Sequence, residues 1–394
     1  MANTLDAVFP RLLAQGLLAL RGATVLPRIV NGDYSNMAAE RGKNIDVPVP
    51  AAVTAQAVAP ANTPPVTADI QPSYVQVPLT QWYEAPFYMT DQDIMNVMNG
   101  TLPMQVSEAV KSLAQQVNAD IFGTYKDFYG FVGTPGTTPF STAAAYSAQD
   151  TKPATDVRKI LNKQLAPMND RRFVLNPDAE AAALNLRAFQ DQSWRGQGPA
   201  LAEGQLARTL GFDWFMDQQV PTHAAGTQTG TVTVNGANGV GVGSTDGGLT
   251  GTLSVATAAA SSTAWVWGDI ITLAGDTQTY VVLAPGLTLG ASATGSANIA
   301  PALKVAQAGG AAITLAAPHV VNLAFQRGAI AFASRPLADN TDGLGNRIMS
   351  QVDPISGLAL RLEISREHKR TRWSFDVLYG MKVIRRQLGC RLAG

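Results

Sequence analysis

A long, almost uncharged stretch in the second half of the chain constrains the fold most. Between His223 and His319 there are four charged residues, Asp246, Asp269, Asp276 and Lys304. Glycine, alanine, threonine, serine and valine dominate this stretch, and short apolar runs are predicted as strands at 230–234, 251–256, 269–273, 278–283 and 312–315. Short strands at even spacing are typical of a small β-barrel or sandwich. Mixed composition returns on both sides, which predicts a β domain inserted into a loop of a host domain.

The clearest helix is predicted over residues 101–128. Apolar side chains recur there at spacings of three and four: Val106, Val110, Leu113, Val117, Ile121, Tyr125 and Phe128. This spacing puts them on one helix face, and Thr101 and Pro103 suit the first turn. Lys111 and Asn118 fall off that face. We expect a long spine helix that runs across a domain.

Proline crowds residues 43–86, and apolar residues alternate on both flanks of that segment, at 45–49 and 75–79. The pattern predicts a two-stranded arm, because proline confines such strands to sheet edges. An isolated hairpin is marginal in water, so we expect the arm to lie on another chain. The alternative is a disordered Pro/Ala linker. The first 30 residues carry a short helical pattern, which is typical of either a mobile terminus or an arm that reaches a neighbouring subunit.

Further elements are predicted around a compact α/β unit and near the end of the chain. Residues 172–175 form a strand, residues 176–178 a turn, residues 179–189 a helix, and residues 210–216 lead into another strand. Alternating apolar residues at 358–364 and 373–377 predict a hairpin whose tip, residues 366–372, is mostly basic.

Composition narrows the function classes. Charged residues make up 15% of the 394 residues and the net charge is zero, so strong attraction to nucleic acid or membrane is not implied. A low-charge surface is typical of extensive burial against other chains, or of β segments padded with small residues. Cys390 is the one cysteine, which excludes an internal disulfide and a cysteine zinc site. The apolar run at 12–20 is too short to span a membrane and lacks the preceding positive charge of a secretory signal.

No motif predicts catalysis, a cofactor or a metal. A phosphate-binding loop and a Gly-x-Ser-x-Gly elbow are missing from the sequence. Glycines at 239–243 read better as a flexible loop than as a dinucleotide fingerprint. His223, His319 and His368 have no helical zinc spacing, and the first two are expected to be structural residues at the domain junction. Cys390 has no histidine near it in sequence. We therefore expect no enzyme.

Residues 361–394 contain nine basic and three acidic residues, not counting His368. The hairpin residues Arg366, Lys369, Arg370 and Arg372 are candidates for non-specific DNA contacts or for contacts between subunits. Without interleaved aromatic residues for base stacking, a solvated hairpin with salt bridges to neighbouring subunits is the favoured interpretation.

Short motifs follow the order of these elements along the whole chain: MANTL at 1–5, VPVP at 47–50, VLNP at 174–177, GFD at 211–213, NLAFQRGA at 322–329, RPL at 335–337 and RWSFDVLYG at 372–380. In combination they resemble the major capsid protein of tailed double-stranded-DNA bacteriophages. The resemblance is greatest to the coat-protein family of short-tailed Salmonella phages, which carries an inserted barrel.

This resemblance implies an α+β fold of the Hong-Kong-ninety-seven type with an inserted small β-barrel. It divides the chain into consecutive parts, some of which return to the same domain. These are an N-terminal arm (1–42), an extended Pro-rich loop (43–90), the spine helix and peripheral domain (91–129), the axial domain (130–222 and 319–345), the inserted barrel (223–318), and C-terminal strands of the peripheral domain (346–394).

Two departures from that family concern possible sites. The insert here is shorter and less charged than the family leads us to expect, so Asp246 is the remaining candidate for a charged contact between capsomers. The lysine, asparagine and acid that some capsid proteins use for self-cross-linking are not recognisable here, and the likened family does not cross-link.

The resemblance also implies partners. These are further copies of the chain in pentamers and hexamers, a scaffolding protein, a portal protein, packaged double-stranded DNA bound without sequence preference, and possible decoration proteins, with no membrane. The expected location is the virion capsid, and the host cytoplasm during assembly. Two alternatives stay open: a secreted or surface β-rich adhesin or fibre subunit, and a cellular nanocompartment shell protein of the same fold.

Overall fold

The computed structural model describes 25–34, 44–49, 73–92, 101–141, 151–186, 208–244, 249–338, 346–353 and 356–394, together with Leu13, Ala14, Gly16, Leu17, Leu20, Pro60, Phe189 and Leu206. The chain divides into two compact units. The first is formed mainly by residues 32–113 and 331–384, and the second by residues 22–31, 114–330 and 385–394.

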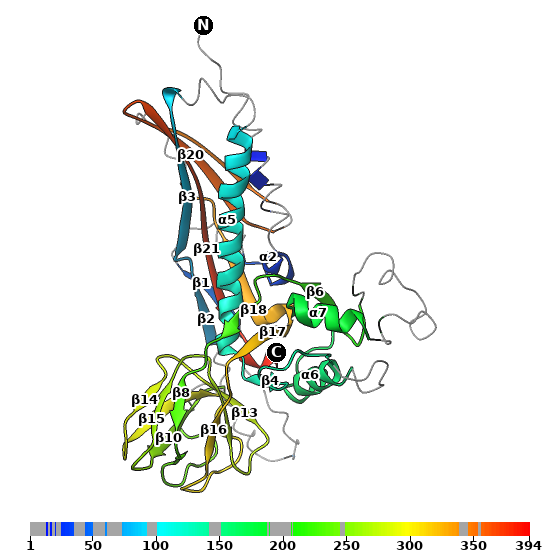
Figure 1. The fold of residues 1–394 in the computed structure, drawn as a ribbon, viewed down its shortest axis with the longest axis vertical. Coiled ribbons are helices and arrows are strands. Elements are labelled where there is room, and N and C mark those ends of the chain that lie inside the picture. Colours follow the sequence, from blue (N-terminus) through cyan, green and yellow to red (C-terminus); the bar gives the residue numbers. More distant parts are fainter. Residues whose placement is uncertain are drawn as a thin grey trace. The chain divides into compact units, whose positions relative to one another are not determined.

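Long antiparallel strands form the first unit. Its five-stranded sheet has the order β18 (Ile330–Ser334), β21 (Arg370–Val383), β20 (Ala359–Glu367) and β19 (Arg347–Val352), and β3 (Gln81–Thr90) also pairs with β21. β20 and β21 form the predicted hairpin, which is confirmed, and β3 runs beside β21 (Figure 1). Phe87 of β3 stacks on Trp373 of β21 at a centroid distance of 6.2 Å. Trp373, Phe375 and Val377 are buried, as their alternation predicts.

The base of the Pro-rich segment is a two-stranded ladder. β1 (Asn44–Val49) and β2 (Ser73–Pro78) are antiparallel, with Ile45 opposite Val77. This confirms the two predicted flanks. Ile45, Val47, Val77 and Leu79 pack on Ala331 and Ala333 of β18, so the base of the arm is buried within its own unit. The tip of the arm, apart from Pro60, lies outside the described residues, as do residues 1–12.

The predicted spine is α5 (Thr101–Gly123), followed by the 3-10 turn η2 (Thr124–Asp127). The stripe that the sequence predicts is buried, with Val106, Val110 and Ile121 at 0% exposure. Asn118, expected off the stripe, is also fully buried. Its side chain accepts from the backbone N–H of Leu26 at 3.0 Å and donates to Asp217 at 2.6 Å.

No helix in the described part of the chain is long and apolar enough to cross a membrane.

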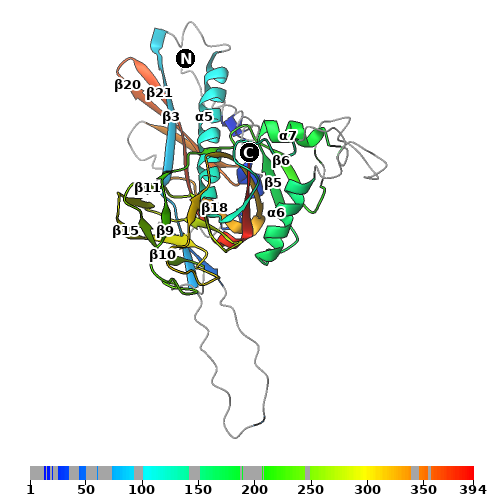
Figure 2. The same cartoon turned by 60° about the horizontal axis from the view of Figure 1, so that its bottom comes forward.

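A mixed five-stranded path lies at the centre of the second unit. Its order is β4 (Gly130–Val132), β22 (Gly389–Ala393), β17 (His319–Gln326), β5 (Arg171–Leu175) and β6 (Asp213–Met216). The β4–β22 and β5–β6 pairs are parallel, and β17 is antiparallel to both of its neighbours. α6 (Lys152–Lys163) packs on β4 and β22, and α7 (Pro177–Leu184) packs on β5 (Figure 2).

The start of α7 follows from its sequence. Asn176 caps α7, as the turn at 176–178 predicts, because its side chain accepts from the N–H of Ala179 at 3.2 Å. α7 ends at Leu184, short of the predicted residue 189. The unit also contains α2 (Leu26–Ile29), η3 (Arg327–Ala329) and η4 (Arg386–Leu388).

The low-charge stretch folds into strands within the second unit (Figure 1). It follows β7 (Thr222–His223) and contains β8 (Thr227–Thr229), β9 (Val232–Val234), β10 (Gly251–Thr257), β11 (Ser262–Trp265), β12 (Ile270–Leu273), β13 (Thr279–Val282), β14 (Leu287–Leu289), β15 (Thr294–Ala300) and β16 (Ile313–Leu315). All five predicted strands are present. β8, β11, β14 and β15 were not predicted: small and polar residues dominate β8, β11 and β15, and β14 has three residues.

The low-charge stretch (residues 223–318, the insert) has a core of its own. Its six-stranded sheet has the order β16-β12-β13-β15-β10-β9, and a bridge between Thr233 and Ala312 joins the two outer strands, so this sheet closes on itself. A three-stranded sheet, β14-β11-β8, completes it. Trp265, Tyr280 and Ile299 lie in the shared apolar cluster. That residues 223–318 fold autonomously stays a prediction.

Two strands join a different sheet from the one that the sequence assignment implies. β22 lies in residues 346–394, expected in the peripheral domain, but it pairs with β17 and β4 of the second unit. β18 lies in residues 319–345, expected in the axial domain, but it joins β21 of the first unit. The alternation of apolar residues predicts a strand and does not specify its partner. The remaining domain boundaries stay predictions.

Candidate functional site

A group of buried polar side chains lies at the base of the insert: His223, Asp269, His319 and Arg391. The incoming strand β7 pairs with the outgoing strand β17, which places His223 opposite His319 with the ring centroids 5.4 Å apart. Both histidines are 2% exposed. His223 Nδ1 lies 2.9 Å from the hydroxyl oxygen of Tyr125, at the end of the spine. The two histidines that flank the insert therefore meet inside the protein.

Asp269 is the acceptor at the centre of this base. Its carboxylate is fully buried and lies 2.9 Å from His223 Nε2. It also accepts from the backbone N–H groups of Gly226, at 3.1 and 3.2 Å, and of Val266, at 2.8 Å. Hydrogen bonds of this kind compensate the cost of burying a carboxylate. Asp269 thus connects the incoming strand to the β11–β12 turn.

Arg391 of β22 lies on the other side of the same turn. It is fully buried, donates from Nη1 to the carbonyl oxygen of Gly268 at 2.7 Å, and lies 5.0 Å from the ring centre of Tyr125. Burial lowers the pKa of Arg391 to about 10, so the side chain stays charged at neutral pH. Gly268 has φ +99, and a Cβ there would lie 2.8 Å from Lys126 Cγ, so this close approach requires glycine.

Two more contacts attach the insert to the segment after the spine. Trp267 Nε1 donates to Asp127 at 3.2 Å, and Lys126 lies 5.4 Å from the centre of the Trp267 ring. Thr279 donates to the carbonyl oxygen of Tyr129 at 2.7 Å. Apolar packing of Tyr129 on Ile270 and Val281 continues this contact. The base of the insert is therefore fixed to the host by hydrogen bonds, charge and packing together.

The hydroxyl, imidazole and carboxylate of Tyr125, His223 and Asp269 resemble a proton relay in their chemistry. All three side chains are buried, and burial raises the pKa of the Tyr125 hydroxyl, which disfavours a nucleophilic phenolate. Burial likewise raises the pKa of the Cys390 thiol, so the group stays protonated. In the described residues, no cluster of three or more His, Cys, Asp or Glu side chains is suited to a metal ion. The arrangement is suited to holding two parts of a fold together.

The junction should weaken in acid. The pKa of His319 is lowered from 6.5 to about 4, chiefly by burial, with Arg391 and His223 acting in the same direction and the carbonyl of Ala317 and Asp269 acting against it. As the pH falls, the unfolded chain therefore binds the proton first. The contribution of His319 to the free energy of unfolding is therefore fully present above about pH 6.5. It falls by about 3 kcal/mol as the pH drops towards 4.

Unfolding free energies measured from pH 7 to pH 4 check this expectation. A His319→Phe variant should lose part of the pH slope, whereas His368→Gln, at an exposed residue of the hairpin tip, should keep the slope of the parent chain. Equal slopes in the parent chain and His319→Phe would contradict a buried, neutral His319.

The basic hairpin tip is largely neutralised within its own unit. Arg366 pairs with Asp91 at 2.6 Å, Arg372 with Glu84 at 2.8 Å, and Arg370 with Glu367 at 2.7 Å. Arg370 also lies 4.4 Å from the ring centre of Tyr88. Lys369 occupies the turn with φ +55. Exposed pairs of this kind contribute little stability, but they reduce the net positive charge offered to DNA. Asp246, the other candidate contact, lies outside the described residues.

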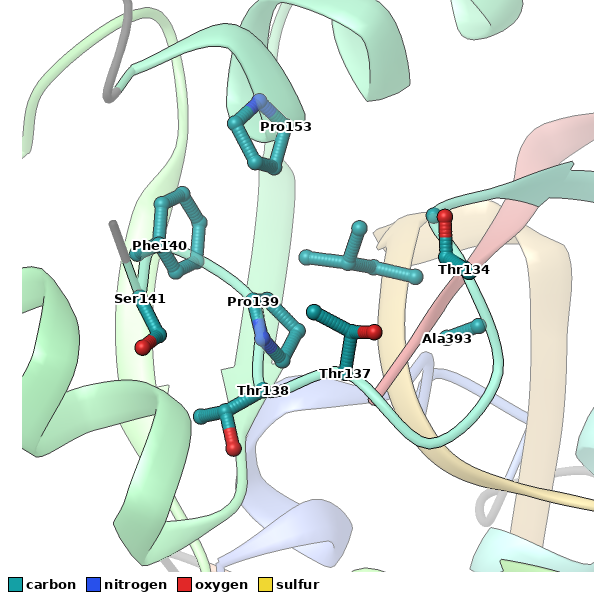
Figure 3. Close-up of a pocket in the computed structure, with 10 residues that line it drawn as sticks. Thr134, Thr137, Thr138, Pro139, Phe140, Ser141, Pro153 and Ala393 are labelled. Atoms are coloured by element: carbon teal, nitrogen blue, oxygen red, sulfur yellow. The ribbon is translucent and has the colours of Figure 1, made fainter. Parts of the chain in front are cut away.

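An open pocket of about 190 Å³ lies in the second unit beside the end of β22 (Figure 3). Its wall comes from the segment after β4, from the start of α6 and from the end of β22: Gly133, Thr134, Thr137, Thr138, Pro139, Phe140, Ser141, Pro153, Leu392 and Ala393. None of these side chains is charged. Phe140 has φ +63 and packs edge-on against Trp214 at a centroid distance of 6.1 Å.

Comparisons with known proteins give structural relatives only. No family model matches the chain, and no curated protein matches it. A chain in the structure of Mycobacterium phage Che8 is 13% identical, and the alignment covers 94% of this chain and 90% of the other, with a TM-score of 0.51. A chain in the capsid structure of the cyanophage P-SCSP1u is 12% identical, with coverages of 94% and 88% and a TM-score of 0.50.

The chain has the Hong-Kong-ninety-seven-type phage capsid fold. This confirms the predicted fold class, while the low identities support the fold alone. In this capsid fold the buried base of the insert is the site that the sequence did not reveal. His223 and His319 were visible as flanks of the insert. Asp269 and Arg391 carried no signal, since one looked like a strand residue and the other like part of a basic tail.

Proposed function

We propose that this chain is a major capsid protein, which assembles with copies of itself into an icosahedral shell around a phage genome and catalyses no reaction. The observation that supports this most is a capsid fold aligned over 94% of the chain, from a solved phage capsid at a TM-score of 0.50. The 10-residue edge strand β3, with Trp82 61% and Tyr88 48% exposed, is consistent with surface that other copies cover.

Expression of the chain, alone and with a scaffolding protein, tests the proposal. We expect closed particles of uniform size by electron microscopy and sedimentation. A protein that stays a folded monomer under both conditions would contradict it. Fibres would instead favour the adhesin or fibre subunit, which the low-charge β segment first suggested.

The finer assignments are parts of the same proposal. Partners would be a scaffolding protein, a portal protein and packaged DNA, with a decoration protein as an option, in a particle assembled in the host cytoplasm. The β insert supports a relationship to the short-tailed Salmonella phage coat proteins. A nanocompartment shell of the same fold is the second candidate, and nucleic acid extracted from purified particles would separate the two.

DNA binding by the assembled shell should be weak and independent of sequence. The whole chain has 29 basic and 29 acidic residues, and residues 223–319 contain one of the basic residues, Lys304, and three of the acidic ones. The remainder of the chain therefore has 28 basic and 26 acidic residues. The pairing of Arg366, Arg370 and Arg372 lowers the available charge further. Fluorescence anisotropy with two unrelated duplexes should give similar affinities that fall with salt. A preference above about tenfold would contradict this, because specific readers reach roughly 10³ or more.

A further inference from the structure

The loop that ends α6 carries an unusual residue. Leu165 has φ +58, which is the left-handed region. Ala166 N donates to Leu161 O at 3.0 Å and Leu165 N donates to Asn162 O at 3.1 Å, which is the hydrogen-bond pattern of a Schellman motif. The position that Leu165 occupies is usually glycine, because an L-residue there costs about 1–2 kcal/mol. The fold of the chain therefore favours glycine at this position.

The side chain of Leu165 makes little packing contact within its own subunit. It is 87% exposed, and Met168, three residues later, is 66% exposed. The loop between them is held firmly from beneath by Arg171, which is 2% exposed. Its guanidinium donates to Pro167 O at 2.7 Å, to Ala166 O at 2.7 Å and to Asn162 Oδ1 at 2.8 Å. Two large apolar side chains are thus presented to solvent on a rigid support, a preorganised arrangement that lowers the entropic cost of binding.

A receiving site of matching chemistry lies at the opposite end of the same helix. Pro153, in the first turn of α6, lines the pocket of about 190 Å³ shown in Figure 3. A cavity of roughly 150 Å³ accepts a benzene molecule, so the pocket is large enough for a leucine side chain. Residues 164–168 and the pocket lining are both free of charged side chains, so their contact would bury no unpaired charge.

The loop cannot fill the pocket of its own chain. The 12 residues of α6 separate the two by a rigid helix of about 18 Å. A tip and a pocket at two different places on one subunit define a head-to-tail contact, which closes into a ring when the rotation between copies allows it. A head-to-tail contact is the type that a pentamer or hexamer repeats around its axis.

We propose that Leu165 and Met168 of one copy insert into the pocket between Gly133 and Ser141 of the next copy, and that this contact closes the capsomer ring. The inference rests on the proposed capsid function and names the residues of one of its interfaces. Its occupant is a second copy of this chain. It accounts for a leucine where the local backbone favours glycine.

The variant Leu165→Gly separates assembly from folding. Glycine relieves the left-handed backbone, so we expect a melting temperature equal to or above that of the parent chain. Removing the side chain should weaken each contact by about tenfold or more, so the yield of closed particles should collapse. Ser292→Gly is the matched control, because Ser292 is also exposed with φ +54 but has no large apolar side chain, and it should assemble normally.

Wild-type particle yield from Leu165→Gly would overturn the contact and leave the capsid function standing, since the parent chain tests that function separately. A lower melting temperature of Leu165→Gly would also overturn it, because the leucine would then serve its own subunit. A parent chain that forms no particles under any condition would instead remove the proposed function.

Cross-linking tests the geometry of the contact. Cys390 is fully buried, so new cysteines at Leu165 and at Thr137 on the pocket rim can be joined selectively by a short bismaleimide. The double variant, assembled and then treated, should give a ladder of covalent oligomers up to five and six chains on a denaturing gel. Each single variant should give no ladder. No ladder from assembled particles of the double variant would overturn the proposed pairing.

Discussion

Replacing Asp269 with alanine should lower the free energy of unfolding by about 3–5 kcal/mol, because its buried hydrogen-bond partners and the nearby charge of Arg391 would lose the carboxylate that compensates their burial. The carboxylate is fully buried and serves His223 together with the N–H groups of Gly226 and Val266. Its loss leaves these donors without their acceptor and removes a negative charge near Arg391. Because these donors and Arg391 stay buried away from water, the loss of stability exceeds that caused by losing an exposed ion pair.

Calorimetry or denaturant titration of the purified chain measures this loss. Asp46→Ala is the control, since Asp46 is exposed on β1 and should change stability by no more than about 0.5 kcal/mol. Arg391→Met should also destabilise the chain, because Gly268 loses its donor. If Asp269→Ala and Asp46→Ala melted at the same temperature, the base of the insert would not be an energetic support of the fold.

Shortening one buried side chain of the spine helix should lower the free energy of unfolding by nearly as much. Leu113 of α5 is 3% exposed, and Leu113→Ala should lower the free energy of unfolding by about 2–5 kcal/mol through lost burial and a residual cavity. In an assembling protein, we expect the result as aggregation or failed assembly at elevated temperature. The measurements are the melting temperature and the particle yield.

Lys111→Ala, two residues earlier on the same helix, is the matched control. Lys111 forms an exposed pair with Glu108 at 2.8 Å, which contributes little. Leu113→Ala with the stability and yield of Lys111→Ala would show that this helix face is not a core.

The parts of the fold that the sequence predicted correctly depend on periodicity. The stripe from Val106 to Ile121 has helical spacing over several turns, and the pattern survives because burial covers one continuous face. β20 and β21 were predicted for the same reason at a period of two. β11 and β15 were missed, because each contains a single large apolar side chain, Trp265 or Ile299, among small and polar residues.

The buried polar contacts and the candidate site were less predictable, since their residues depend on distant partners. Asn118 looked like a solvent-facing helix residue, yet it is buried by hydrogen bonds to Leu26 and Asp217, about 100 positions away in sequence. Arg391 was counted with a basic tail and instead lies inside the protein beside Gly268. Leu165 gave no sequence signal, because its significance lies in a backbone angle. Tertiary partners and left-handed backbone positions leave no periodic trace in a single sequence.

A cryo-electron-microscopy reconstruction of the particles that the full chain forms, with scaffold where needed, tests the central claim most directly. The proposed function predicts a closed shell with icosahedral symmetry. Each subunit should show the spine helix α5, the long strands β3, β20 and β21, and the insert attached through His223 and His319. Open fibres, or a chain that remains a folded monomer under every assembly condition, would contradict it.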